Sequence, residues 1–206
     1  VDTGVNSSQL KKLARDVDIN VLINSHYHID HVRGNYLFPK ASLYAPFKDA
    51  PAIDSFEKFL DMTGFRRNQE LLSYFDKWKK KLFDARAGVR VKTRFRNSYE
   101  FNFGDTLLRV IPAPGHTPGH SCFFEPKSKT LFSTDIDLTP FGPWYGNAAS
   151  DVEDFIDSIE ALHNLRPKVV ASSHSGPFEG KDKIDLMFEK YIDVIYQREE
   201  KILDLL

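Results

Sequence analysis

Short apolar runs alternate with polar, turn-forming segments along most of the chain. Several runs are rich in β-branched and aromatic residues and are too short for helices, so they predict strands. These strands are expected at residues 19–24, 41–45, 99–103, 106–111, 120–125, 130–133 and 168–172. Gly104-Asp105 and residues 126–129 have the composition of turns, which predicts that two neighbouring pairs of strands form hairpins.

Apolar residues spaced three or four apart predict helices in the rest of the chain. These helices are expected near residues 7–14, 55–62, 69–83, 150–162 and 182–206. The second and third are separated by Gly64 and predict a helical insertion, at about residues 52–88, in a single domain of residues 1–206. Ser150 and Glu153 have the spacing of a capping box, which predicts that Ser150 caps the helix that follows.

The bulk composition is that of an ordinary globular protein. The formal net charge is −1, so there is no general attraction to nucleic acid or to a membrane surface. No apolar run reaches the roughly 20 residues of a membrane helix, and we expect no membrane association. The single cysteine, Cys122, excludes an intrachain disulfide, and with no recognisable signal peptide it predicts a cytoplasmic protein. Cys122 lies in a predicted strand, so we expect a buried, unreactive thiol.

The segment from Arg66 to Arg96 is strongly basic. It holds eleven lysines and arginines but only three acidic residues, Glu70, Asp76 and Asp84. One interpretation is a solvated helix face, and the other is a basic lid that attracts an anionic substrate. The sequence leaves both interpretations open.

Four potential metal ligands lie within six residues, directly after the first predicted strand. They are His26, His28, Asp30 and His31. Imidazole nitrogens and carboxylate oxygens suit zinc, iron or manganese. On an extended chain His26 and His28 point the same way and can share one ion, while Asp30 and His31 can turn toward a second. This spacing after a strand predicts a metal-binding loop rather than an incidental surface cluster.

Three further donors also follow predicted strands: His116, Asp135 and His174. If all these strands share one sheet, the donor-bearing loops meet at one edge and form a two-metal centre, where bound water becomes a good nucleophile. His120 is expected to orient a ligand or to contact the substrate, with plain loop packing as the alternative. His163, near the end of a predicted helix, is expected to be a solvated helix-end residue.

The complete pattern resembles the metallo-β-lactamase superfamily of hydrolases. The resemblance rests on His-x-His-x-Asp-His at residues 26–31, on Pro-Gly-His-Thr-x-Gly-His at residues 114–120, and on the strand-end Asp135 and His174. It implies an α/β fold of four layers, an αββα sandwich with the metals between the sheet edges. Asp2 matches a structural acidic turn of the family. We expect N-terminal strands of the family's first sheet to be missing ahead of this chain, and no C-terminal domain like that of glyoxalase II.

The resemblance also implies which residues bind metal, in a set similar to that of glyoxalase II. The first ion would be held by His26, His28 and His116, the second by Asp30, His31 and His174, and both by a bridging Asp135. Two divalent metals are therefore expected, with zinc first and iron or manganese also compatible. Asp30 and His120 are the expected catalytic residues.

The expected function is hydrolysis of a small ester, thioester, lactone or phosphoester by a hydroxide that bridges two metals. Phe141, Trp144 and Tyr145, with the helical insertion, are expected to line the substrate pocket; ordinary loop packing is the alternative. A mononuclear iron dioxygenase of the same fold, and a nuclease similar to ribonuclease Z that uses the basic segment for phosphates, stay open. We expect a small-molecule substrate and no nucleic-acid partner, and a homo-oligomer is compatible with the sequence.

Overall fold

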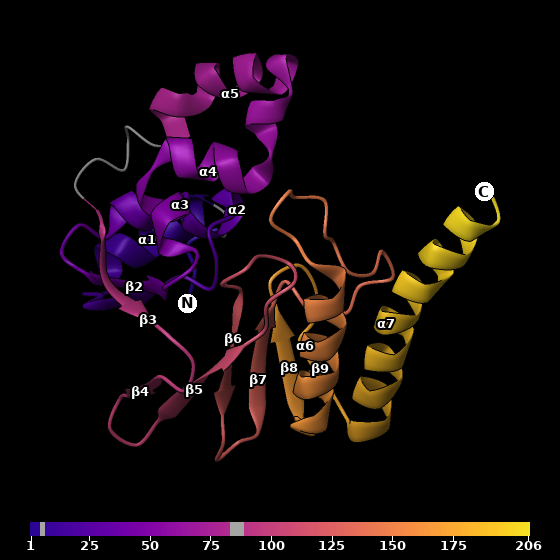
Figure 1. The fold of residues 1–206 in the computed structure, drawn as a ribbon. Coiled ribbons are helices and arrows are strands. Elements are labelled where there is room, and N and C mark those ends of the chain that lie inside the picture. Colours follow the sequence, from indigo (N-terminus) through magenta and orange to yellow (C-terminus); the bar gives the residue numbers. More distant parts are fainter. Residues whose placement is uncertain (5–6, 83–88) are drawn as a thin grey trace. The chain divides into compact units, whose positions relative to one another are not determined.

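The computed structural model describes residues 1–4, 7–82 and 89–206 (Figure 1). The chain divides into two compact units. The N-terminal unit comprises residues 1–96 with the short segments 117–119 and 147–149, and the C-terminal unit comprises the remainder. This division does not test the expectation of a single domain over residues 1–206, which stays a prediction.

The N-terminal unit contains a sheet of three parallel strands in the order β1-β2-β3. The strands are β1 (Val21–Ile23), β2 (Ser42–Pro46) and β3 (Val91–Phe95). Parallel neighbours need crossover connections, and short helices occupy them: α2 (Ile29–Val32) and η1 (Asn35–Leu37) lie between β1 and β2. Helix α1 (Ser7–Asp16) precedes the sheet, and its Leu10 is buried with Leu22 and Leu43. The predicted strands at 19–24 and 41–45 are thereby confirmed.

The predicted helical insertion lies between β2 and β3. It consists of α3 (Ala50–Asp54), α4 (Phe56–Thr63), η2 (Phe65–Arg67) and α5 (Gln69–Leu82), of which α3 was not predicted. The Ser55 hydroxyl accepts from the Lys58 amide and so caps α4, which ends at Gly64 as predicted. Phe56, Phe59 and Leu60 enter a buried cluster, which explains the apolar spacing. The predicted last residue of α5, Phe83, lies outside the described residues, as do residues 84–88.

The C-terminal unit contains a sheet of six strands in the order β4-β5-β6-β7-β8-β9. The strands are β4 (Glu100–Asn102), β5 (Leu107–Pro112), β6 (Ser121–Glu125), β7 (Thr130–Thr134), β8 (Val169–Ser172) and β9 (Phe178–Glu179). Both predicted hairpins are confirmed, because β4 pairs with β5 and β6 with β7 in antiparallel register. The strands that precede the predicted donors do not all share one sheet. β1 belongs to one sheet, and β5, β7 and β8 belong to another.

Helices α6 (Val152–Asn164) and α7 (Lys181–Leu203) complete the C-terminal unit and run beside its sheet (Figure 1). Their apolar stripes join the sheet in one buried cluster, to which α6 contributes Phe155 and Ile159 and α7 contributes Phe188 and Tyr191. The predicted cap is displaced by one residue. Asp151, not Ser150, is the N-cap, and its carboxylate accepts from the Asp154 amide.

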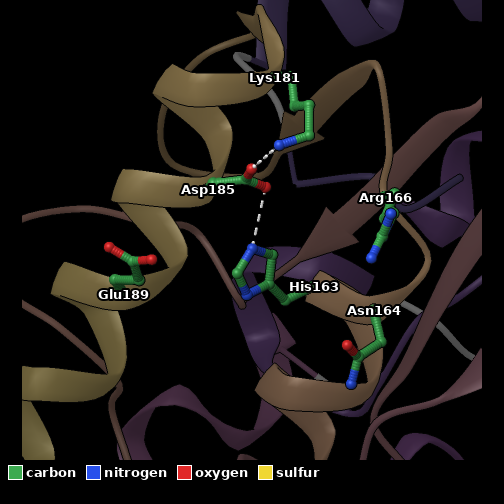
Figure 2. Close-up of a pocket in the computed structure, with 6 residues that line it drawn as sticks. All are labelled: His163, Asn164, Arg166, Lys181, Asp185 and Glu189. Carbon is green, nitrogen blue, oxygen red and sulfur yellow. Dashed lines mark hydrogen bonds and ion pairs between the residues drawn. The ribbon is translucent and has the colours of Figure 1, made fainter.

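His163 does not behave as a solvated helix-end residue. Its Nε2 lies 3.0 Å from Asp185 Oδ1 of α7, and its ring stacks on Phe188 with centroids 5.0 Å apart. Lys181 Nζ lies 2.7 Å from the other Asp185 oxygen. These side chains border a pocket of about 260 Å³, shown in Figure 2, whose lining also includes Asn164, Arg166 and Glu189. His163 thus lies in the last turn of α6, as predicted, but its side chain is only 33% exposed and ties α6 to α7.

No helix among the described residues has the length and apolar character needed to cross a membrane.

Candidate metal centre

The predicted metal-binding segment of the N-terminal unit begins directly after β1. His26 and His28 lie on the loop, whereas Asp30 and His31 belong to the short helix α2. The His26 ring centroid lies 4.6 Å from that of His28 and 4.1 Å from that of His31, so three imidazoles are packed together. His26 and His31 are buried, while Asp30 is half exposed. The segment thus presents one solvent-accessible carboxylate beside three clustered rings.

The Asp2 carboxylate contacts this segment at Ser25 and His31. Its Oδ1 accepts from the Ser25 amide at 2.8 Å, and its Oδ2 lies 2.7 Å from Ser25 Oγ and 2.9 Å from His31 Nδ1. Ser25 Oγ in turn lies 2.9 Å from His26 Nδ1. A carboxylate only accepts, so His31 carries its proton on Nδ1 and directs Nε2 away from Asp2. The predicted structural role of Asp2 is consistent with these contacts.

His28 has a partner that the sequence did not reveal. Its Nε2 lies 2.5 Å from the Asn147 amide nitrogen, which is also 3.0 Å from the Tyr27 hydroxyl. Asn147 is buried and belongs to the N-terminal unit with residues 147–149. If the Asn147 amide donates to Nε2, this nitrogen of His28 carries no proton. The proton of the neutral ring is then on Nδ1. Nothing local in the sequence marks Asn147 for this role.

Asp49 is a second residue that the sequence did not reveal. Its carboxylate is fully buried and accepts from the Tyr27 amide at 3.1 Å, from the Thr117 hydroxyl at 2.6 Å and from the Gly119 amide at 2.7 Å. Tyr27 stands between His26 and His28. Three donors compensate a buried charge that would otherwise be very costly. The same charge, with burial as the larger cause, raises the pKa of the Tyr27 phenol far above its ordinary range.

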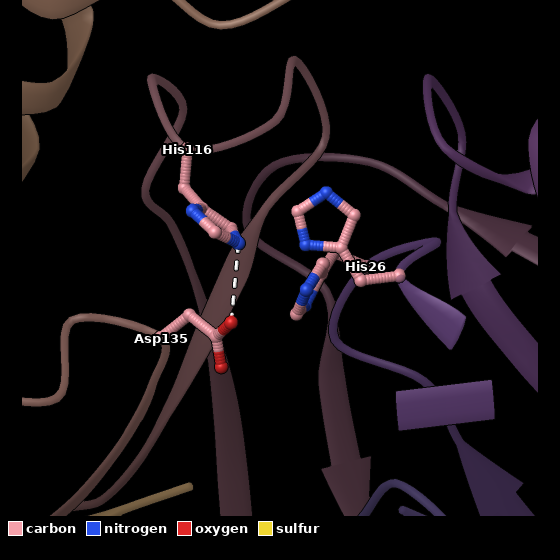
Figure 3. A group of neighbouring side chains, drawn as sticks. His26, His116 and Asp135 are labelled. Carbon is pink, nitrogen blue, oxygen red and sulfur yellow. Dashed lines mark ion pairs between the residues drawn. The ribbon is translucent and has the colours of Figure 1, made fainter. Parts of the chain in front are cut away.

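The C-terminal unit brings together the three donors predicted at its strand ends. His116 follows β5, Asp135 follows β7 and His174 follows β8. Asp135 is central: one carboxylate oxygen lies 3.1 Å from His116 Nε2 (Figure 3), and the other lies 3.4 Å from His174 Nε2. His116 and Asp135 are largely buried, whereas the His174 side chain is 45% exposed. A carboxylate between two imidazoles is the arrangement expected of a bridging ligand.

His116 is supported on both its ring and its backbone. Its Nδ1 lies 2.8 Å from the Trp144 carbonyl oxygen, and the Ser150 hydroxyl donates to the His116 carbonyl at 2.9 Å. A carbonyl only accepts, so Nδ1 carries the proton and Nε2 faces Asp135. The contact to His116 also explains why Ser150 does not cap α6.

His120 is buried, with both ring nitrogens engaged. Its Nδ1 donates to the Ala113 carbonyl at 2.8 Å, so its Nε2 accepts from the Thr134 hydroxyl at 2.7 Å. Thr134 directly precedes Asp135 and has a φ of +49°, unusual for a β-branched residue. His120 therefore supports the turn that presents Asp135. This geometry fits the expectation that His120 orients a ligand.

The three aromatic residues predicted to line a substrate pocket lie on the loop before α6. Phe141 is 65% exposed and Trp144 is 42% exposed, while Tyr145 is half-buried and packs against the main cluster of the unit. The Trp144 ring centroid lies 5.6 Å from that of His116. Trp144 is thus next to a predicted ligand, and Phe141 offers an accessible apolar ring.

Cys122 is buried as predicted. Burial is the main cause that raises the pKa of its thiol far above the ordinary range. The thiol therefore stays protonated and unreactive.

The sequence has a match among known families. The model of the family described as the metallo-beta-lactamase superfamily matches residues 1–174, which is most of the chain. The chain belongs to the metallo-β-lactamase superfamily. Two solved metallo-β-lactamases show the shared fold. For FEZ-1 from Legionella gormanii the TM-score is 0.69 at 17% identity, and the match covers 97% of this chain and 83% of the FEZ-1 chain. BJP-1 of Bradyrhizobium japonicum, with a TM-score of 0.65 at 19% identity, covers 100% and 84%. The predicted fold class is confirmed.

Curated relatives in the superfamily carry several names. The chain is 25% identical over 147 residues to the acyl-coenzyme A thioesterase MBLAC2 of Homo sapiens, covering 69% of this chain and 50% of the relative. It is 27% identical over 171 residues to a hydroxyacylglutathione hydrolase of Thermosynechococcus vestitus, covering 80% and 53%. It is 26% identical over 166 residues to the N-acyl homoserine lactonase AttM of Agrobacterium fabrum, covering 77% and 57%. The chain thus spans about half the length of these relatives.

The metallo-β-lactamase fold implies divalent metal ions, and the donor set of this member fits them. His31 and His116 each have Nδ1 bound to an oxygen acceptor of the protein, and the Nδ1 of His26 lies beside a hydroxyl. Metal-binding histidines are typically held in this way through the nitrogen that does not bind the metal. The residues therefore fit divalent cations that prefer nitrogen and carboxylate ligands.

The basic segment of this superfamily member is partly neutralised within its own unit. Arg66 lies 2.7 Å from Asp61, Lys79 lies 3.6 Å from Glu57, and these contacts are exposed. Arg94, on strand β3, lies 3.4 Å from Asp54. Of the two interpretations, the exposed pairs of Arg66 and Lys79 favour a solvated face among the side chains that the structure describes.

Proposed function

We propose that this protein is a dinuclear metal-dependent hydrolase that acts on a small ester, thioester, lactone or phosphoester, with acyl thioesters as the first class to test. The observation that carries the proposal is the Asp135 carboxylate, whose two oxygens face two different histidines, His116 and His174. A carboxylate in this position can bridge two cations, each completed by further histidine or aspartate ligands.

The proposed ligands follow the pattern of the superfamily. One cation is held by His26, His28 and His116, the other by Asp30, His31 and His174, and Asp135 binds both. Two divalent ions, when bound, lower the pKa of a coordinated water toward ~7 and polarise the scissile carbonyl or phosphoryl oxygen. Zinc is proposed as the metal because histidine nitrogen and carboxylate oxygen suit it well.

The residues of the chain supply orientation and proton transfer. Asp2 and the Trp144 carbonyl fix the rings of His31 and His116, so that little reorganisation is needed when the reaction proceeds. Asp30 is the most exposed carboxylate of the set, with a side chain 52% exposed. It is therefore the group best able to hold a proton released from the attacking water. His120 acts indirectly, by supporting Thr134 and the turn to Asp135.

The substrate class is proposed from the relatives and from the aromatic loop. Two of the relatives are named for acyl groups carried on coenzyme A or glutathione, and a third for a lactone. All three names refer to acyl compounds. The exposed Phe141 ring, and Trp144 beside His116, offer apolar surface for an acyl chain.

Hydrolysis by the purified, zinc-loaded protein tests this proposal. The panel contains an acyl-coenzyme A, an acyl glutathione, an acyl homoserine lactone and a phosphodiester. We expect turnover of at least one acyl substrate, abolished by a chelator and restored by zinc. Asp30→Asn should reduce kcat by at least 100-fold, because general acid-base groups contribute roughly 10²–10⁴-fold.

Asp105→Asn is the matched control, because Asp105 is an exposed turn residue of the C-terminal unit. It should leave turnover unchanged. A fully zinc-loaded protein that is inactive on the whole panel would contradict the proposal. Activity that survives complete metal removal would contradict it as well.

A further inference from the structure

The aromatic loop, residues 139–146, is fastened to helix α7 by one arginine. The Arg198 guanidinium donates to the carbonyl oxygens of Phe141, at 2.5 Å, and Pro143, at 2.6 Å. The same guanidinium carbon lies 5.1 Å from the Phe141 ring centroid and 5.4 Å from that of Tyr145. Only arginine offers a planar fork of N–H donors, so lysine cannot reproduce both carbonyl contacts at once.

Gly142 lets the aromatic loop approach α7 closely. Its φ is +79°, and a Cβ at this position would lie 2.5 Å from Cγ1 of Val194 on α7. Any larger residue would therefore be strained and would also push the loop away from the helix. The path of the loop depends on contact with α7 at two adjacent points, Gly142 and the carbonyls held by Arg198.

The other end of the same loop supports His116. The Trp144 carbonyl receives the Nδ1 proton of His116 at 2.8 Å, and His116 Nε2 then faces Asp135 at 3.1 Å. Trp144 is one residue beyond Pro143, whose carbonyl Arg198 binds. A movement of the loop at Arg198 would therefore displace the acceptor that fixes the His116 ring.

We propose that Arg198 is a positioning residue for His116. It holds the aromatic loop against α7, so that the Trp144 carbonyl accepts the Nδ1–H of His116 and fixes the ring with Nε2 toward Asp135. This inference rests on the proposed function only for the role of His116 as a metal ligand. The arrangement of loop and ring can be measured in the metal-free protein.

The test is the ¹⁵N NMR spectrum of histidine side chains in metal-free protein, followed by zinc affinity from competition with a chromophoric chelator. In the wild type, we expect the His116 Nδ1–H to give a signal that exchanges slowly with solvent, because the Trp144 carbonyl accepts this proton. In Arg198→Ala and Arg198→Lys, we expect this Nδ1–H to exchange faster and the zinc affinity to be roughly tenfold weaker, as for other residues that support ligands. Lys201→Ala removes an exposed charge from the same helix and should match the wild type.

A second pair of variants perturbs the loop from its own side. Gly142→Ala should reproduce the effect of Arg198→Ala. Gly104→Ala is its control, because Gly104 also has a positive φ, +75°, but its Cβ would meet nothing within 4 Å. If Arg198→Ala does not fold, Gly142→Ala carries the test.

The inference is supported if the His116 Nδ1–H exchanges faster in each of Arg198→Ala and Gly142→Ala that folds, while the controls match the wild type. The inference is overturned if this signal keeps its wild-type exchange rate in either folded variant, or if the wild type lacks a slowly exchanging His116 Nδ1–H. A wild type that hydrolyses nothing would contradict the proposed function but would leave the exchange measurement valid.

Discussion

The Asp49 carboxylate accepts a 2.6 Å hydrogen bond from the Thr117 hydroxyl, 68 residues further along the chain. The same carboxylate receives the amides of Tyr27 and Gly119. Asp49 thereby fixes the backbone inside both histidine motifs, between His26 and His28 in the first and directly after His116 in the second. A buried residue outside the proposed ligand set thus organises the two segments that carry proposed ligands.

Asp49→Asn should destabilise the protein. The asparagine amide keeps one acceptor oxygen and replaces the other with a donor group. That group would face either the Gly119 amide, or the Tyr27 amide and the Thr117 hydroxyl. We expect the free energy of unfolding of the metal-free protein to fall by about 2 kcal/mol, the scale for a buried polar group left without partners. Urea unfolding measures this change. Asp18→Asn, at an exposed position, should stay within about 0.5 kcal/mol of the wild type; equal midpoints for both variants would be evidence against this role of Asp49.

Asp2→Asn should weaken metal binding while the fold persists. The substitution removes the carboxylate that accepts the Nδ1 proton of His31 and the hydroxyl of Ser25. Loss of such a supporting carboxylate typically costs about 10–100-fold in metal affinity. Zinc competition with a chelator measures it, and Asp105→Asn is the control. An Asp2→Asn affinity within twofold of that control would refute the supporting role.

Thr134 affects the free energy of unfolding in two opposite ways. Its hydroxyl donates to buried His120, but its φ of +49° is strained for a β-branched residue. Thr134→Val keeps the strain and removes the donor, and should cost about 1–3 kcal/mol of unfolding free energy. Thr134→Gly loses the same bond but relieves the strain, so it should be about 1 kcal/mol less destabilising than Thr134→Val. Urea unfolding compares the two, and the opposite order would show that the strain is not released.

The lowered pKa of the Asp185 carboxyl should make the stability of the fold depend on pH. Hydrogen bonds from Lys181, as the larger cause, and from His163 hold the pKa of Asp185 below its ordinary value of 3.8. A carboxyl group with a lowered pKa stabilises the fold above its unfolded-state pKa, and this contribution is lost as the pH falls through the lowered pKa. Wild type should therefore exceed Asp185→Asn in stability at pH 6, and the difference should shrink steadily below pH 3.8. Thermal unfolding across this range measures the difference, and a constant gap down to pH 2 would contradict the assignment.

The ligand-bearing segments could be predicted because their signals are local. His26 to His31 follow β1 within a few residues, and His116, Asp135 and His174 each follow a strand that its apolar pattern identifies. Helices α4 and α5 were predictable for the same reason, since apolar residues three or four apart supply the buried Phe56, Phe59 and Leu60 of α4 and the partly buried Leu72 and Phe75 of α5. The sheet to which each strand belongs has no such local signal, and the condition that the donor-bearing strands share one sheet is not met.

The supporting residues could not be predicted because their partners are remote in sequence. Asp49 and Asn147 act on residues 68 and 119 positions away. Ser150 and Asp151 are both good caps by residue type, and only the contact of Ser150 with the His116 carbonyl decides between them. His163 was predicted from its place at a helix end, but α7 supplies Asp185 as its partner.

The central claim is that the ligands at residues 26–31 and those at His116, Asp135 and His174 bind the same two cations. Anomalous diffraction at the zinc absorption edge, from crystals of the zinc-loaded full chain, tests it most directly. The proposal predicts two peaks, one bound by His26, His28 and His116, the other by Asp30, His31 and His174, with Asp135 on both. The claim would be contradicted by peaks bound only by residues 26–31, by peaks bound only by His116, Asp135 and His174, or by the absence of peaks.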